Sequence, residues 1–180
     1  MKNCLKIAIL IVAIIFPLTG CQVGKSSPPV GQDKKSEEKK VILAKSVDPS
    51  KEGSWTKLSE FTIDLDGDEK EETIGLYTSA ERDAKGEIMW DDGQNWLLLV
   101  EDDNFYYPLF SRYVQLGSVY FTIAYHGEEK EPTVTVLVST GGGLTLTNYL
   151  YDSKSQGYLE KLDYDSGPIN SMFTSFPGYL

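Results

Sequence analysis

The sequence predicts an all-β protein, arranged as an antiparallel sandwich or a strongly twisted meander of about seven to nine strands. Two observations support this prediction. Apolar residues recur at every second position in several runs rich in β-branched and aromatic side chains, and turn-forming residues separate these runs. No long window shows the periodicity of an amphipathic helix, and we expect at most a short helical turn within residues 79–87.

The N-terminal segment, residues 1–20, has the layout of an export signal. Lys2 and Lys6 precede the apolar run Ile7–Phe16, which is too short to span a bilayer as a helix. The next residues, Leu18-Thr19-Gly20-Cys21, resemble the lipobox of bacterial lipoproteins. The resemblance implies that residues 1–20 are a signal peptide. It also implies that Cys21 carries acyl chains such as palmitate, which anchor the protein to the extracytoplasmic face of the cell membrane. An ordinary secretory signal or an uncut anchor is the alternative.

Residues 21–54 are predicted to be a flexible linker between the lipid and a folded domain. They are rich in Lys, Ser, Pro and Gly and contain no aromatic residue, so they bury too little apolar surface to offset their ordering entropy. The apolar patch Val41–Ala44 differs from its surroundings. It either docks on the domain as an edge strand or stays a sticky patch of the linker.

The domain predicted at residues 55–180 is strongly acidic. The whole chain has 17 Lys and Arg against 27 Asp and Glu, and residues 55–180 hold 8 of these cations and 22 of the acids, a net charge of about −14. Such a domain repels the phosphates of nucleic acids, which argues against DNA or RNA binding. Both cysteines, Cys4 and Cys21, precede the domain, which leaves it without a disulfide or a thiolate ligand.

Alternating apolar residues locate the strands within residues 55–180. Strands are expected in Phe61–Leu65, Val119–His126, Thr133–Val138 and Leu144–Tyr151. The run Trp96–Val100 is apolar at every position, which predicts a central strand buried on both faces. Turns are expected between the strands, at Asp92-Gly93, Glu101–Asn104, Gly127–Glu129, Gly141–Gly143 and Ser153–Gly157.

The run DLDGDEKEE, residues 64–72, carries six carboxylates between two expected strands. Alternate residues of a tight loop can direct their oxygens to one centre, and calcium accepts about six to eight oxygen ligands. Gly67 allows the positive φ that such a loop often needs. We therefore expect a calcium site, and the alternative is a solvated acidic turn. The expected ligands are the side chains of Asp64, Asp66, Asp68 and Glu72 and the backbone carbonyl of Lys70.

This loop is not an EF-hand, because Glu69 and Gly75 stand where that loop needs glycine and glutamate. It resembles the calcium loop of FG-GAP/VCBS repeats, the integrin-like β-propeller family, in which D-x-D-G-D-G-x-x-D joins two strands. Asp64, Asp66, Gly67 and Asp68 match, whereas Glu69 replaces a glycine and Glu72 an aspartate. The resemblance implies a calcium loop within a propeller-blade-like hairpin. About 126 residues are too few for a closed propeller, so the domain is a two-blade fragment or an unrelated sheet.

No catalytic residue is assigned. His126 is the single histidine, and the glycines at Gly141–Gly143 are not followed by the Lys and Ser or Thr of a phosphate-binding loop. We therefore expect a non-enzymatic binding or structural module, with the membrane as one partner and an envelope protein or a glycan as another. The alternative is a hydrolase that acts on envelope polymers through paired carboxylates.

Overall fold

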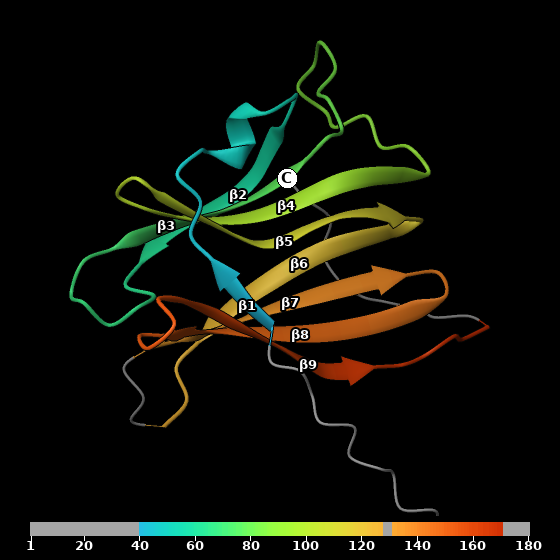
Figure 1. The fold of residues 1–180 in the computed structure, drawn as a ribbon. Coiled ribbons are helices and arrows are strands. Elements are labelled where there is room, and N and C mark those ends of the chain that lie inside the picture. The colour runs from blue at the N-terminus through green and yellow to red at the C-terminus, as the bar shows by residue number, and fades with distance from the viewer. Residues whose placement is uncertain (1–39, 128–130, 171–180) are drawn as a thin grey trace, which may run out of the picture. The chain divides into compact units, whose positions relative to one another are not determined.

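The computed structural model describes residues 40–127 and 131–170, which form strands and one short 3₁₀ helix (Figure 1). The predicted signal peptide, Cys21 and the first part of the predicted linker lie outside the described residues. In the part that the structure describes, no helix is long and apolar enough to cross a membrane. The elements are β1 (Lys40–Leu43), η1 (Pro49–Lys51), β2 (Thr56–Ile63), β3 (Glu72–Thr78), β4 (Gly93–Asp102), β5 (Phe105–Gln115), β6 (Gly117–Ala124), β7 (Thr133–Thr140), β8 (Gly143–Asp152) and β9 (Gly157–Asp165).

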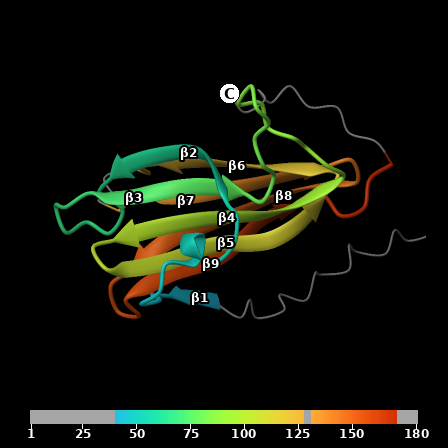
Figure 2. The same ribbon diagram turned by 90° about the horizontal axis from the view of Figure 1, so that it is seen from above.

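The strands form two antiparallel sheets (Figures 1 and 2). One sheet has the order β2-β3-β4-β5 and the other the order β1-β9-β8-β7-β6. All strand pairs except β1 with β9 join strands that follow one another in the chain, so each sheet is mainly a meander of hairpins. The predicted all-β class is confirmed. Neither sheet closes on itself and no propeller forms within the described residues.

The two sheets share one hydrophobic core, because strands of both sheets turn apolar residues to the space between them. Strand β4 is buried along the whole predicted run Trp96–Val100, and it is an inner strand of its sheet, as predicted. Aromatic rings join the sheets near one edge, where Tyr107 of β5 meets Tyr158 of β9 edge to face at 5.3 Å. The core also contains Leu65, Ile74, Leu76, Leu109, Phe110, Val119, Val134, Val136 and Tyr149.

The chain passes from one sheet to the other through a single residue, Leu116, between β5 and β6. Leu116 has a φ of 48°, which turns the backbone sharply. Gly117 follows it, and a Cβ there would lie 2.6 Å from the carbonyl oxygen of Ser139, so only glycine fits. The turn after β7 closes on this corner, because the N–H of Gly141 donates to the Leu116 carbonyl at 3.2 Å.

The domain begins before Trp55, within residues predicted to be linker. Strand β1 pairs antiparallel with β9, so the apolar patch Val41–Ala44 contributes an edge strand, the first of its two expected roles. Lys45 then exchanges backbone hydrogen bonds of 2.8 and 3.0 Å with Tyr106 of β5. The segment that holds η1 leads from there to β2, an edge strand of the four-stranded sheet β2-β3-β4-β5 (Figure 2).

Hairpin connections alternate between the two ends of the sandwich. The acidic loop 64–71 lies at the same end as the turns after β4, β6 and β8, and the long β3–β4 connection lies at the opposite end. No helical turn forms within residues 79–87, where at most a short one was expected. Asp83 instead accepts backbone hydrogen bonds from Lys85 and Glu87, and Arg82 and Ile88 form an isolated β-bridge. The aspartate side chain and Gly86, with a φ of 85°, favour a tight turn over a helix.

Candidate metal centre

Aspartate side chains fold the β2–β3 loop onto itself. Asp64 accepts backbone hydrogen bonds from Gly67 at 2.7 Å and from Glu69 at 3.1 Å. Asp66 accepts one from Asp68 at 3.1 Å. Short aspartate side chains that bond to the backbone two or three residues ahead are typical of tight turns. This part of the sequence therefore curls locally, and Asp64 and Asp66 are half-buried in it.

Three carboxylates meet at the base of this loop. Asp64, Asp66 and Glu72 each contribute one oxygen, and these oxygens all lie within 4.8 Å of one another. The two aspartates are half-buried, whereas Glu72, the first residue of β3, is only 3% exposed. Oxygens bound to one hard cation at about 2.3–2.6 Å lie at most about 5 Å apart. The triad can therefore hold a metal ion that contacts all three residues.

Glu72 links the two ends of the loop by a hydrogen bond. Its Oε2 accepts the backbone N–H of Leu65 at 2.6 Å, and the Leu65 side chain is fully buried in the core. Burial raises the pKa of Glu72 to about 7, against the lowering effect of the Leu65 hydrogen bond, and nearby Asp66, Asp102 and Asp64 raise it further. The carboxyl is thus held in place at a point where its negative charge is costly without a cation.

The pKa of the neighbouring acids is also raised. Burial is the main cause for Asp66, and the charges of Asp68, Asp102 and Asp64 add to it. Asp102, at the end of β4, has its pKa raised by burial and by Asp103 and Asp68. Acids this close disfavour each other's ionisation, and a bound cation removes that repulsion.

The structure brings three of the five predicted ligands together. Asp68 lies outside the triad, because its carboxylate pairs with the Lys70 ammonium at 3.2 Å and accepts the Lys70 backbone N–H at 2.8 Å. These hydrogen bonds lower the pKa of Asp68. The Lys70 side chain is thus directed to Asp68.

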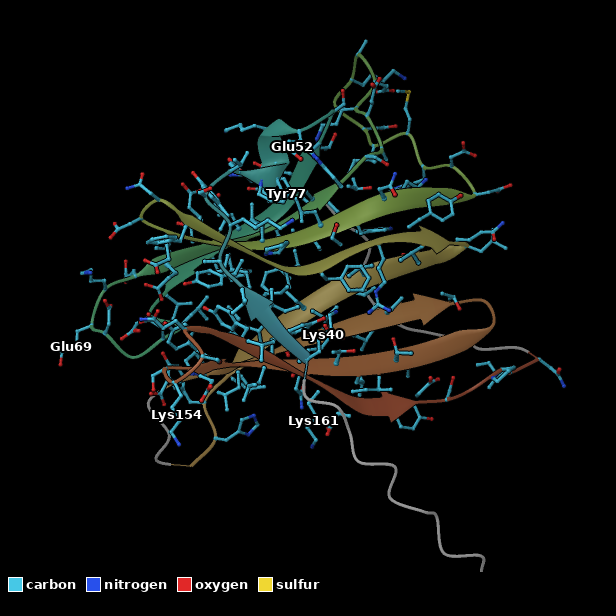
Figure 3. The ribbon with its side chains drawn as sticks, viewed as in Figure 1. Lys40, Glu52, Glu69, Tyr77, Lys154 and Lys161 are labelled. Carbon is cyan, nitrogen blue, oxygen red and sulfur yellow. The ribbon has the colours of Figure 1, made fainter. Side chains whose placement is uncertain are left out.

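The loop backbone uses the left-handed region twice. Gly67 has a φ of 81°, the conformation for which a glycine was expected. Glu69 has a φ of 72° and projects from the tip of the loop (Figure 3). Glu69 stands where the FG-GAP/VCBS pattern has its second glycine, so the backbone follows a conformation suited to that glycine.

Two further acids near the loop were not predicted from the sequence. Glu131, just before β7, places its Oε1 3.1 Å from the position that a Cβ on Gly67 would take. Asp102 acts on the pKa of both Asp66 and Glu72. Asp102 ends β4 and Glu131 precedes β7 at the same end of the sandwich, so only the strand order brings them to the loop.

The donor set fits a hard cation. The clustered atoms are carboxylate oxygens, which calcium and magnesium prefer, whereas softer metals favour imidazole or thiolate ligands. Comparisons of the chain with protein-family models, with curated proteins and with solved structures found no match. The interpretation of this centre therefore rests on its geometry and electrostatics.

Proposed function

We propose that the chain is a lipoprotein of the extracytoplasmic membrane face, anchored by acyl chains on Cys21. Its β-sandwich is a non-enzymatic binding or structural module, with a calcium ion bound by Asp64, Asp66 and Glu72. The observation that carries the calcium site is the buried Glu72 carboxylate beside two loop aspartates, with oxygens within 4.8 Å. The lipobox-like residues before Cys21 support the anchor.

Calcium suits this loop better than magnesium. Magnesium demands near-ideal octahedral geometry at about 2.0–2.1 Å and retains several waters, whereas calcium accepts irregular sets of oxygens at longer distances. The three carboxylates come from a curled loop and a strand end, and their backbone hydrogen bonds fix the loop independently of any octahedral arrangement. Calcium sites of extracellular modules bind with dissociation constants near 10⁻⁴–10⁻³ M.

The position of Glu72 favours a structural clamp over hydrolysis. A hydrolase with paired carboxylates needs both groups within reach of the polymer that it cleaves. Glu72 has the most strongly raised pKa among the described carboxyl groups, yet it is 3% exposed and bonded to the Leu65 backbone. A cation there joins β2, through Asp64 and Asp66, to β3.

Thermal unfolding of the full-length chain in detergent tests the metal site. We expect calcium at about 100 times its dissociation constant to stabilise the fold by about 2.7 kcal/mol relative to EDTA, a rise in Tm of several degrees. Asp66→Asn removes one charged ligand and should abolish most of this rise. Magnesium at the same concentration should give a smaller one.

Glu81→Gln is the matched control, because Glu81 is an exposed acid in the β3–β4 connection at the opposite end of the sandwich. It should keep the full calcium response. Identical unfolding curves in EDTA and in calcium would make the acidic loop a solvated turn and refute the metal site.

A further inference from the structure

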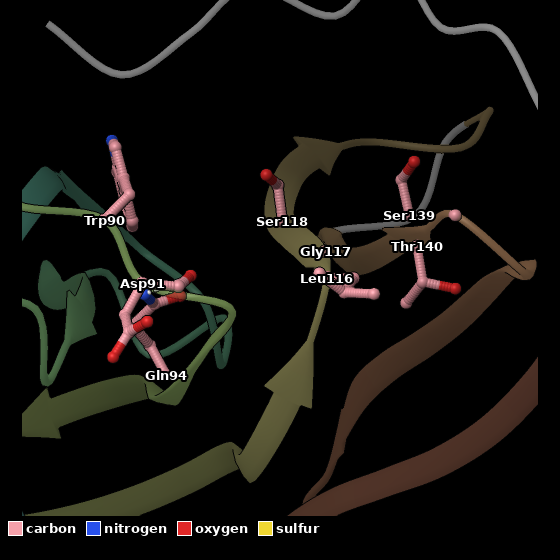
Figure 4. A pocket seen from close by; sticks show the side chains of 9 residues that line it. Trp90, Asp91, Gln94, Leu116, Gly117, Ser118, Ser139 and Thr140 are labelled. Atoms are coloured by element: carbon pink, nitrogen blue, oxygen red, sulfur yellow. Dashed lines mark hydrogen bonds between the residues drawn. The ribbon is translucent and has the colours of Figure 1, made fainter.

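A hollow of about 390 Å³ opens at the end of the sandwich opposite the acidic loop. Three segments line it: the end of the β3–β4 connection with the start of β4, the corner at Leu116, and the end of β7 (Figure 4). These segments are distant in the sequence. They meet because successive hairpin connections lie at alternate ends of the sandwich. The volume of the hollow lies in the range of small-ligand sites.

One wall of the hollow is a fixed aromatic surface. The Trp90 indole is 47% exposed and stacks on Trp96, with ring centroids 5.7 Å apart and ring planes at 17°. Trp96 is fully buried in the core, so the stack holds the exposed indole in one orientation. A rigid aromatic face binds the apolar side of a ligand with little loss of side-chain entropy.

Besides Trp90, Asp91, Leu116 and two glycines, the hollow is lined by neutral polar side chains. Gln94 of β4 and Ser139 of β7 are 5% and 9% exposed, and Ser118 of β6 is partly buried (Figure 4). The Gln94 amide nitrogen donates to the Asp91 carbonyl at 2.8 Å, which fixes the plane of the amide. Thr140 Oγ1 is bonded within the β7–β8 turn. The hydrogen-bonding groups of the hollow are therefore attached to ordered backbone and are pre-arranged.

The charge of the hollow restricts its ligand. Asp91 is the one charged residue among the described residues that line it, and no lysine or arginine stands with it. A phosphate or carboxylate ligand would find no counter-charge there, in a domain with a net charge of about −14. A sugar ring is neutral, has a C–H face that stacks on indole, and has a rim of hydroxyl groups that bond to hydroxyls, amides and carboxylates.

We propose that the hollow formed by Trp90, Asp91, Gln94, Ser118 and Ser139 binds a neutral carbohydrate, with one sugar ring stacked on Trp90. The proposal rests on the proposed role of the domain as a binding module, and it selects a glycan over an envelope protein as the partner. The acidic loop takes no part in it, because that loop lies at the opposite end of the sandwich.

Calorimetric titration of the full-length chain in detergent tests the proposal. The probes are neutral tetrasaccharides of glucose, galactose, mannose and N-acetylglucosamine, each at up to about 10 mM, the range of weak affinities. At least one should bind. Trp90→Ala should weaken that binding by about tenfold or more, because it removes the stacking surface, and Trp90→Tyr should retain most of it.

Two further variants keep the test decisive. Ser118→Leu fills the hollow without altering the tryptophan stack, so it should also abolish binding. It provides the test if Trp90→Ala proves poorly folded. Trp55→Ala is the matched control, because the Trp55 indole donates to the Glu52 carbonyl and does not line the hollow. It should bind as the unchanged chain does.

The proposal is overturned if none of the four saccharides binds, or if folded Trp90→Ala and Ser118→Leu chains bind as tightly as the unchanged chain. Asp66→Asn separates this result from the calcium site. It should lose the calcium-dependent rise in Tm and keep saccharide binding, so either site can fail without the other.

Discussion

Glu69 has a φ of 72° at the tip of the acidic loop, where the Cβ of an L-residue crowds the backbone. Its side chain is exposed and projects away from the fold (Figure 3). The strain is maintained because Asp64 accepts the Glu69 backbone N–H at 3.1 Å and so fixes the turn. The residue thus adopts a conformation that the hydrogen-bonded turn imposes and that its own side chain disfavours.

Replacing this residue by glycine should stabilise the protein. Glu69→Gly relieves a backbone cost of about 1–2 kcal/mol, which is partly offset by the larger freedom of glycine in the unfolded chain. We expect a net gain of about 0.5–1 kcal/mol in the free energy of unfolding, measured with urea in the presence of calcium.

Glu71→Gly is its control, because Glu71 is also exposed and has no positive φ. That change should lower stability through the added chain entropy alone. Equal losses for both variants would contradict the strain assigned to Glu69.

The residue pattern predicted part of the acidic cluster that forms the candidate metal centre. The spacing of Asp64, Asp66 and Glu72 was sufficient to place them together, because turns built by aspartates are local. The spacing could not separate Asp68 from the triad, because whether Asp68 faces a cation or pairs with Lys70 depends on where the lysine side chain lies. Glu131 approaches Gly67 only through the β6–β7 turn, and no local spacing could have selected it.

At the scale of elements, β1 depends on a glycine in its partner strand. Gly157 begins β9, and a Cβ there would lie 2.5 Å from the Ile42 carbonyl oxygen and 3.1 Å from the Val41 side chain. The Gly157 position is therefore what lets the four-residue β1 approach its neighbour. An exposed ion pair at 2.7 Å, between Lys40 and Glu160, lies further along the same pair of strands.

Gly157→Ala should displace β1 from the sheet. The added methyl group collides with backbone, which cannot move without breaking the pairing, so we expect a loss of about 1–3 kcal/mol in the free energy of unfolding. Hydrogen exchange should show faster exchange at residues 40–43 than in the unchanged chain.

Gly141→Ala provides the comparison, since a Cβ there meets no atom within 4 Å and Gly141 has no positive φ. It should leave both quantities unchanged. If Gly157→Ala behaved the same way, β1 would not be held against β9 as closely as the structure shows.

Element prediction succeeded where the apolar period was clear. The hairpins of β6, β7 and β8 follow their alternation and their turn residues, and β4 follows its continuous apolar run. The predicted domain boundary at Trp55 was too late, because the Lys- and Ser-rich composition around Val41 conceals a strand whose partner is 120 residues away at the Lys40–Glu160 contact. The apolar patch marked the edge strand as one alternative, but pairing over that distance leaves no local signal that identifies β9 as its partner.

For the whole molecule, the crowded acids determine how stability depends on pH. Folding raises the pKa of Glu72 from 4.5 to about 7 and raises that of Asp66 and Asp102. An acid with a raised pKa binds its proton more tightly in the folded state. Its contribution to the free energy of unfolding is present at low pH. This contribution is lost as the pH rises from the unfolded-state pKa through the folded-state pKa. Asp68 and Asp152, whose pKa is lowered, act in the opposite sense below about pH 4.

In EDTA, the free energy of unfolding should therefore fall between about pH 4.5 and pH 7, by about 3 kcal/mol for Glu72. Glu72→Gln keeps an acceptor for Leu65 and removes the titrating group, so it should flatten this fall. Glu71→Gln, at the exposed neighbouring acid, should not. Calcium should suppress the fall in the unchanged chain, and a profile that rises over this range in EDTA would refute the raised pKa.

Among the described strands, the pairing of β1 with β9 is the one that is not a hairpin, and it affects the order in which the fold can be completed. Every other pair can form as soon as its hairpin is available, whereas β1 must wait until β9 is present. A chain that crosses the membrane N-terminus first delivers β1 early and its partner late. Until then, β9 presents an unpaired edge that another chain could extend. Strand β1 is thus the last strand to pair, and its docking against β9 completes the fold.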